Sequence, residues 1–346
     1  MQSRLNLGAD FAFPKLHAKW ARAVAGEALE QALRAGSVQA LSRTYEQYGV
    51  AVRARKDVQK RLTLHLLQDL AEIAHLLKPA MGDFYLRLID RFFLENLKTV
   101  LHYRYVPDES TDISYLLVDI PQLPPLNAQM LLEARSVHQF YSRLPANKFK
   151  ADLLEILVEL DDSKDMFVAE TQIDALYYDH LTAALEALPP TARGVARELV
   201  RSEIDTVNII TILRNVTVYK LDRDRVAALM IPGATMDDEK LKTTLADQES
   251  QSDVVGLLPE PYRKILGAYV ERPLYMSENA LWGYVFALAQ AHFYDYNRPI
   301  RAVPAYPFLR RFEHQNLARL FEGKYLHLNP AVIRTMMIGL DHVQAG

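Results

Sequence analysis

The chain has 346 residues, of which 50% are hydrophobic and 24% charged, and its formal net charge is −3. This composition is typical of a globular protein with a sizeable core, and it lacks the strong basic field that binds nucleic acid. Cysteine is absent, which excludes disulfides, zinc-thiolate sites and cysteine nucleophiles and fits the cytosol. The first residues do not resemble a secretory signal. The most apolar stretch, residues 280–293, is shorter than the roughly 20 residues that a membrane span needs.

Apolar residues at three- and four-residue steps predict long helices throughout the chain. In chain order, we expect helices over residues 52–77, 81–105, 191–218 and 280–296. Proline punctuates them, and the clusters at residues 121–125, 232 and 304–307 are candidate boundaries. The last helix is apolar almost all round, so we expect it to be buried. The aromatic residues of this helix are expected in the core: Trp282, Tyr284, Phe286, Phe293, Tyr294 and Tyr296.

A helical pattern recurs three times along the chain. An asparagine followed by an apolar helix stands at Asn96, Asn208 and Asn316, at intervals of 112 and 108 residues. A short helix opened by serine precedes each of them, and its first residues are Ser37, Ser136 and Ser252. Serine suits a helix N-cap, because its oxygen accepts a free backbone N–H. We expect each asparagine to satisfy free backbone groups where two helices cross.

The repeat predicts an all-α protein of three similar helical bundles. We place them at residues 1–110, 111–225 and 226–346. If the bundles pack alike, a pseudo-threefold axis relates them. Three bundles around an axis can enclose a central cavity, which suits a socket better than a catalytic cleft.

Several segments resemble one known family. Residues 201–214 resemble the Glu-x-Asp-x-x-Asn-Ile-x-x-x-Leu-Arg signature of the C subunits of V/A-type rotary ATPases, whose eukaryotic counterparts are the d subunits. Residues 173–181 are similar to the family's Asp-x-x-Tyr-Tyr helix, and residues 96–98 to its first Asn-Leu-Lys motif. Residues 313–317, with Gly323 and Lys324, resemble its C-terminal Glu-x-x-Asn-Leu and Gly-Lys turn. The first repeat departs from the others, since Phe93 stands where they carry Asp205 and Glu313.

The resemblance implies an all-α funnel without catalytic activity, cofactor or metal, and it assigns no site residues. It implies one copy per complex, at the cytoplasmic face of the membrane and peripheral to it. Its partners would be the central shaft subunits and the proteolipid ring of the rotary ATPase. The chain would link the two and transmit torque for ATP-coupled proton or sodium transport.

The main alternative rests on Asp161, Asp162 and Asp165. An Asp-Asp-x-x-Asp motif after a leucine-rich helix is typical of all-α, magnesium-dependent prenyl diphosphate synthases. Such enzymes need a second aspartate-rich helix, and the best candidate here, Asp237 with Asp238, has Leu241 in its third position. We therefore favour a structural role for the motif, as acidic residues at a helix start.

Other chemical motifs are weak. His292 and Asp295 share a helix face, but two residues make a poor metal site. Gly323-Lys324 lacks the upstream glycine of a phosphate-binding loop, because Ala318 occupies that position.

Overall fold

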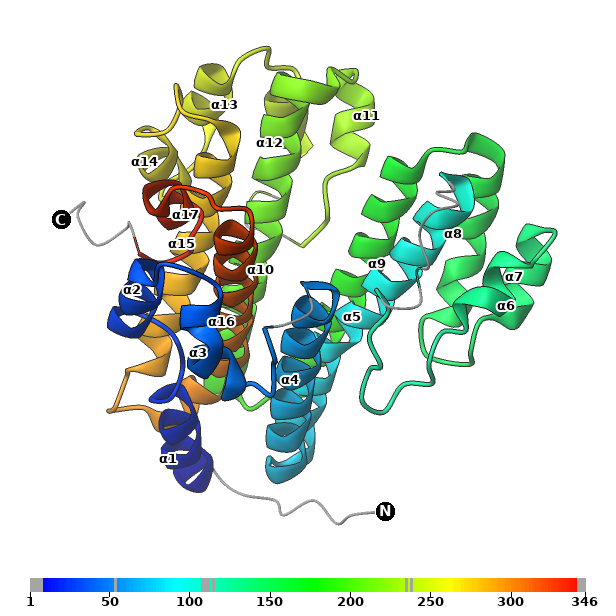
Figure 1. The fold of residues 1–346 in the computed structure, drawn as a ribbon. Helices are drawn as coiled ribbons and strands as arrows, with labels where there is room; N and C mark the ends of the chain where they lie inside the picture. The colour runs from blue at the N-terminus through cyan, green and yellow to red at the C-terminus, as the bar shows by residue number, and fades with distance from the viewer. Residues whose placement is uncertain are drawn as a thin grey trace. The chain divides into compact units, whose positions relative to one another are not determined.

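The computed structural model describes residues 9–52, 55–106, 113, 116–233, 236 and 239–340. The regular elements in this part of the chain are all helical (Figure 1), which confirms the predicted all-α class. No described helix is long and apolar enough to cross a membrane. The chain divides into two compact units, one built on residues 48–186 and one on residues 7–47 together with 187–346. The division into three bundles stays a prediction.

The first unit consists of two helical hairpins and two short helices. Its helices are α4 (Arg55–Leu76), α5 (Pro79–Tyr105), α6 (Ala128–Leu132), α7 (Val137–Arg143), α8 (Lys150–Ser163) and α9 (Met166–Leu185). The long helix α5 packs against both α4 and α9 and is therefore the centre of this unit. It begins with Pro79, whose missing N–H would have no partner in the first turn.

The second unit is built around three long helices of its own, α10 (Pro190–Arg214), α15 (Leu274–Phe293) and α16 (Ala302–Tyr325). At its N-terminal side it has α1 (Ala9–Trp20), α2 (Glu27–Arg34), a 3-10 turn (Gln39–Leu41) and α3 (Ser42–Glu46). The remaining elements are a π-helical turn (Asn215–Tyr219), α11 (Arg223–Ala228), α12 (Glu239–Ala246), α13 (Gln251–Leu257), α14 (Tyr262–Leu266), a 3-10 turn (Pro299–Arg301) and α17 (Pro330–Thr335). Helix α15 packs against both α10 and α16 (Figure 1).

Two sequence predictions about this unit need correction. The prolines at 304 and 307 do not separate bundles, because both lie inside α16. Pro304 falls in the first turn, where a helix needs no proline N–H. The aromatic residues expected in the core also divide, since Phe286 and Phe293 are buried whereas Tyr294 and Tyr296 are 43% and 64% exposed. They are exposed because α15 ends at Phe293, before both tyrosines.

Candidate functional site

The three repeated asparagines make the same contact. Each one donates from its Nδ2 to a backbone carbonyl and accepts at its Oδ1 from the N–H of the same residue. The carbonyl distances are 2.7 Å for Asn96 with Val118, 2.9 Å for Asn208 with Ile231 and 2.9 Å for Asn316 with Ile338. The N–H distances are 3.1, 2.8 and 2.8 Å in the same order.

A primary amide presents one donor and one acceptor side by side, as a neighbouring strand would. Each asparagine therefore satisfies both backbone groups of one residue that lies 22 or 23 positions further along. The prediction that the amide satisfies free backbone groups is confirmed. Its partner is a residue in a loop or turn, however, and not the end of a crossing helix.

The serine caps recur as well, with one correction. Ser37 accepts from the N–H of Ala40, and Ser136 accepts from the N–H of Gln139, both at 3.2 Å. In the third segment the cap is Ser250, which accepts from the N–H of Asp253 at 3.2 Å, and not Ser252. Ser252 lies inside α13.

The first two asparagine helices each contact the serine-capped segment that follows them in the chain, and the third contacts the N-terminal serine-capped segment. In the first unit, Phe93 of α5 stacks on Phe149, with ring centroids 6.4 Å apart. In the second unit, Tyr262 donates to Asp205 of α10 at 2.8 Å. The third asparagine helix, α16, pairs instead with the N-terminal segment, where Tyr45 donates to the Leu317 carbonyl at 2.7 Å.

The residue three positions before each asparagine is buried and contacts a second segment of the chain. We call this contact the joint of the repeat. Asp205 also accepts from the N–H of Met236 at 3.2 Å, and Glu313 accepts from the N–H of Val24 at 2.7 Å. Burial, together with the nearby Asp205 carboxylate, raises the pKa of Tyr262. The neutral hydroxyl therefore remains a donor to Asp205. The departure at Phe93 is thus accompanied by a second one, because its partner is Phe149 and not a tyrosine.

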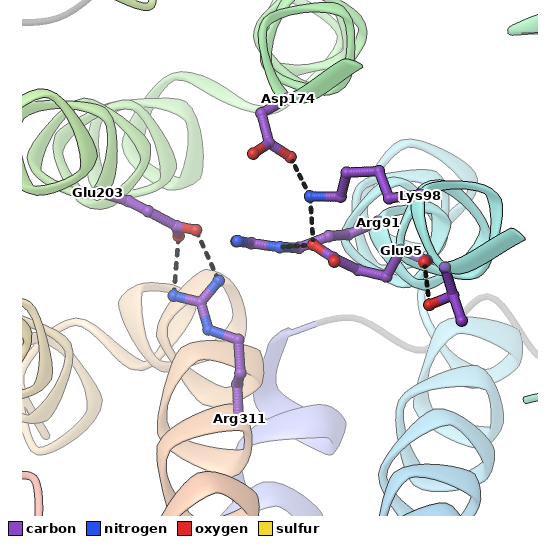
Figure 2. Close-up of polar contacts among 7 residues, drawn as sticks. Arg91, Glu95, Lys98, Asp174, Glu203 and Arg311 are labelled. Carbon is purple, nitrogen blue, oxygen red and sulfur yellow. Dashed lines mark hydrogen bonds and ion pairs between the residues drawn. The ribbon is translucent and has the colours of Figure 1, made fainter. Parts of the chain in front are cut away.

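A buried ion pair joins two of the long helices in the second unit. Both carboxylate oxygens of Glu203 in α10 accept from the guanidinium of Arg311 in α16, at 2.8 Å each (Figure 2). The side chain of Glu203 is fully buried and that of Arg311 is 13% exposed. At the end of the same signature, Arg214 forms a bidentate pair with Glu278 of α15, at 2.8 and 3.1 Å. The signature at residues 201–214 therefore supplies joints between helices.

In the first unit, the Asn-Leu-Lys motif and the Asp-x-x-Tyr-Tyr motif contact each other. Lys98 of α5 donates to Asp174 of α9 at 2.8 Å, and its ammonium lies 3.1 Å from Glu95 (Figure 2). Burial disfavours the charge on Lys98, but the two carboxylates outweigh it, and its pKa lies above the ordinary value. The guanidinium of Arg91 lies 5.7 Å from the ring centre of Tyr177, within cation–π range.

The C-terminal Gly-Lys turn holds another helix end. The ammonium of Lys324 donates to the carbonyls of Leu33 and Ala35, at 2.7 and 2.6 Å, and so caps α2. A Cβ at position 323 would lie 2.7 Å from the side chain of Ile333, so only glycine fits there without a shift. In this turn the lysine acts as a structural cap of α2.

The aspartates of the alternative hypothesis lie at the junction of α8 and α9. Asp161 accepts from Lys164 at 2.8 Å and from Tyr105 at 3.0 Å, and the bond from Lys164 lowers its pKa. Asp162 is exposed, and Asp165 caps α9 by accepting from the N–H of Val168 at 3.2 Å. Only Asp165 therefore stands at a helix start, since Asp161 and Asp162 end α8. Asp237 and Asp238 lie outside the described residues.

His292 belongs to a charged cluster at the C-terminal end of α15. Its Nε2 lies 2.9 Å from Glu198, and its Nδ1 accepts from Arg301 at 3.1 Å. Arg301 also donates to Asp295 at 2.7 Å. Burial lowers the pKa of His292. Among the described residues, no group of three or more histidine, aspartate or glutamate side chains could hold a metal ion.

A cavity of about 360 Å³ in the first unit holds a buried aspartate. The carboxylate of Asp90 contacts Lys148 and lies 3.4 Å from Arg87. The carboxylate therefore already has cationic partners.

The chain matches the family model described as the ATP synthase (C/AC39) subunit over residues 15–336. It is 22% identical over 343 residues to the C subunit of the A-type ATP synthase of Methanocaldococcus jannaschii, covering 94% of this chain and 85% of that protein. It is 23% identical over 259 residues to the C subunit of the A-type ATP synthase of Methanosarcina acetivorans, covering 72% and 68%. With the corresponding C subunit from Thermococcus kodakarensis it shares 20% over 186 residues, or 54% of this chain and 49% of that one. The chain therefore belongs to the family of C (AC39) subunits of ATP synthases.

Proposed function

We propose that this chain is the non-catalytic adaptor of a V/A-type rotary ATPase, which links the central shaft to the proteolipid ring. In this role it transmits torque between ATP-driven subunits and the ring, and so couples ATP to the transport of protons or sodium. One copy sits on each complex, at the cytoplasmic face of the membrane and peripheral to it.

The observation that carries this proposal is the use of the family's signature residues as fixed joints. Asn96, Asn208 and Asn316 each bind both backbone groups of a second segment. Glu203 and Lys98 join long helices through charged pairs. A body that transmits torque must resist twisting, and buried hydrogen-bonded pairs between long helices provide that stiffness.

The three-bundle funnel around a pseudo-threefold axis is part of the proposal. Its support is the threefold recurrence of the asparagine contact and the serine cap. A body with threefold character offers equivalent contacts around an axis, which suits a shaft that is held at its centre and turns together with it.

Co-purification from native membranes tests the proposed role. A tagged chain is expected to recover both shaft and proteolipid ring subunits after mild detergent extraction. The ring without the chain should release the shaft. Recovery of the chain with neither partner would contradict the proposal.

A further inference from the structure

Helix α1 lies at one end of the second unit, where it packs on α16 and on the 3-10 turn before it (Figure 1). Its inner face is a stripe of apolar residues at four-residue steps, Ala12, Leu16 and Trp20, which are at most 7% exposed. This stripe attaches the helix to the rest of the unit. A surface helix attached in this way normally has a polar outer face.

The outer face of α1 departs from this rule in its first turn. Phe11 is 71% exposed, which is the highest value for a large apolar side chain in the described part of the chain. Lys15 is partly exposed and lies four positions further, so it stands on the same face one turn away. An aromatic ring at the helix end is thus followed by a cation.

Two further rings belong to the same end of the unit. Tyr294 and Tyr296 follow α15 and are 43% and 64% exposed. The ring of Tyr296 meets that of Phe13 edge to face at 5.9 Å, and the Nε1 of Trp20 donates to the Tyr294 hydroxyl at 2.8 Å. These contacts fix both tyrosines against α1. We call the three exposed rings, Phe11, Tyr294 and Tyr296, the aromatic tip.

The side chains around the aromatic tip are mainly cationic. Arg298 follows Tyr296 by two positions and is 64% exposed. The carboxylates near the tip already contact positive or histidine side chains, since Asp295 accepts from Arg301 and Glu198 bonds to His292. The cations described at this end are Lys15, Lys19, Arg22, Arg298 and Arg301, against the carboxylates of Asp295 and Glu198.

Rings at a tip with cations behind them have the chemistry of a membrane anchor. Tyrosine and phenylalanine rings settle among lipid headgroups, and the long side chains of lysine and arginine reach the phosphates from further away. Anionic lipids attract such cations in addition. A protein partner explains this composition less well, because lysine is depleted in the centre of protein interfaces.

We propose that the aromatic tip binds the headgroup region of a phospholipid bilayer that contains anionic lipids. The contact is peripheral, because only side chains at the end of α1 and in the turn after α15 enter the interface. This inference rests on the proposed function for the nearness of a membrane. It adds a direct contact between this chain and lipid, besides those with the shaft and the ring.

Binding of the purified full chain to vesicles tests the proposal. The vesicles consist of equal parts of phosphatidylcholine and phosphatidylglycerol, or of phosphatidylcholine alone, and contain neither shaft nor ring. The test variant combines Phe11→Ser with Tyr296→Ser. Thermal unfolding verifies its fold, and Phe11→Ser alone replaces it if the double variant fails to fold.

The matched control removes exposed apolar side chains from the far end of α10, by Val218→Ser with Tyr219→Ser. These residues are 65% and 44% exposed. Glu198, near the start of α10, contacts His292 beside the aromatic tip. Val218 follows it by 20 positions, so it lies roughly 30 Å away along the helix.

We expect the wild type to bind the anionic vesicles at least about tenfold more tightly than the neutral ones. The aromatic variant should bind anionic vesicles at least about tenfold more weakly than the wild type, and the control like the wild type. A second variant, Lys15→Gln with Arg298→Gln, should lose roughly tenfold on anionic vesicles and nothing on neutral ones.

A wild-type chain that stays off anionic vesicles would overturn the proposal, as would an aromatic variant that binds them like the wild type. Equal loss in the control would do the same, because the contact would not lie at this end. Affinity for the detergent-solubilised ring is measured in parallel. If the aromatic variant lost that affinity and kept vesicle binding, the tip would be a protein-docking surface and the proposal would be wrong. Co-purification with shaft and ring is scored separately, so the proposed function can stand when this inference fails.

Discussion

The joint at Phe93 in the first unit and the joint at Asp205 in the second occupy the same position relative to the repeated asparagine. Phe93 stacks on Phe149 with an interplanar angle of 13°, whereas Asp205 accepts from Tyr262. Both residues are buried. The asparagine contact beside them is the same in each case. The joint is thus filled in both repeats, by two apolar side chains in one and by two polar side chains in the other. The asparagine is the same in both repeats because a buried N–H and carbonyl of loop backbone need hydrogen-bond partners.

The largest effect is expected from moving the polar joint into the apolar site. Phe93→Asp should lower the free energy of unfolding by about 5 kcal/mol, because it removes a packed ring and buries a carboxylate without a donor. Adding Phe149→Tyr supplies that donor and should restore about 1–3 kcal/mol. Urea unfolding followed by circular dichroism measures both, with Phe93→Leu as an apolar control that costs about 1 kcal/mol. A double variant no more stable than Phe93→Asp alone would show that the two positions are not a coupled pair.

The buried ion pair of Glu203 and Arg311 allows the opposite change, from a polar contact to an apolar one. Arg311→Met removes the guanidinium that bonds both oxygens of the buried Glu203 carboxylate, and we expect a loss of about 3–5 kcal/mol. The double variant Glu203→Met with Arg311→Met should recover most of this loss, since an apolar pair of similar volume needs no desolvation of charge. Chemical denaturation provides the measurement.

The control for this pair is Arg298→Met. The side chain of Arg298 is 64% exposed beside Asp295, so its loss should change the free energy of unfolding by less than about 1 kcal/mol. If Arg311→Met were equally mild, the pair would not be a joint.

Removal of the asparagine contact should lower the free energy of unfolding in every repeat, but by unequal amounts. Asn208→Ala and Asn316→Ala each leave a buried N–H and carbonyl without partners, and we expect losses of about 2–4 kcal/mol. Asn96 is 8% exposed, compared with 1% and 3% for the other two, so water can partly replace its amide and Asn96→Ala should cost less. Hydrogen exchange at the N–H of Ile231 and Ile338 reports the loss directly, and the exposed Asn297→Ala is the control. Equal stability of wild type and Asn208→Ala would show that the amide contact does not hold the loop.

The smallest expected effect is on the pH dependence of stability, through two histidines of the second unit. Burial lowers the pKa of His292 from 6.5, so the folded state binds fewer protons than the unfolded state as the pH falls below about 6.5. Stability is therefore present above that pH and declines as the pH falls toward the folded pKa. His17, whose pKa burial also lowers, contributes in the same direction. His292→Gln should weaken the slope of stability between pH 7 and 5, while exposed His138→Gln should retain it. A slope unchanged by His292→Gln would assign the dependence to other groups.

Local signals in the sequence predicted local structure well. The recurrence of Asn96, Asn208 and Asn316 indicated a common structural role, and Pro189-Pro190 indicated the start of α10. The third cap was missed because two serines lie two residues apart, and only the structure shows that Ser250 accepts the Asp253 N–H.

Pairs between distant residues could not be predicted, because one chain gives no sign of which charges meet. Arg311 lies 108 positions from Glu203, and Lys324 caps carbonyls 289 and 291 positions away. The exposure of Tyr296 depends on where α15 stops, which its apolar pattern did not show.

The most direct test of the central claim, that this chain passes torque without chemistry of its own, is the ratio of ions transported to ATP hydrolysed. It is measured in vesicles containing the rotary ATPase with and without this chain. We expect the depleted enzyme to hydrolyse ATP without transport, and the added chain to restore coupling. Undiminished transport per ATP in the depleted enzyme would contradict the account.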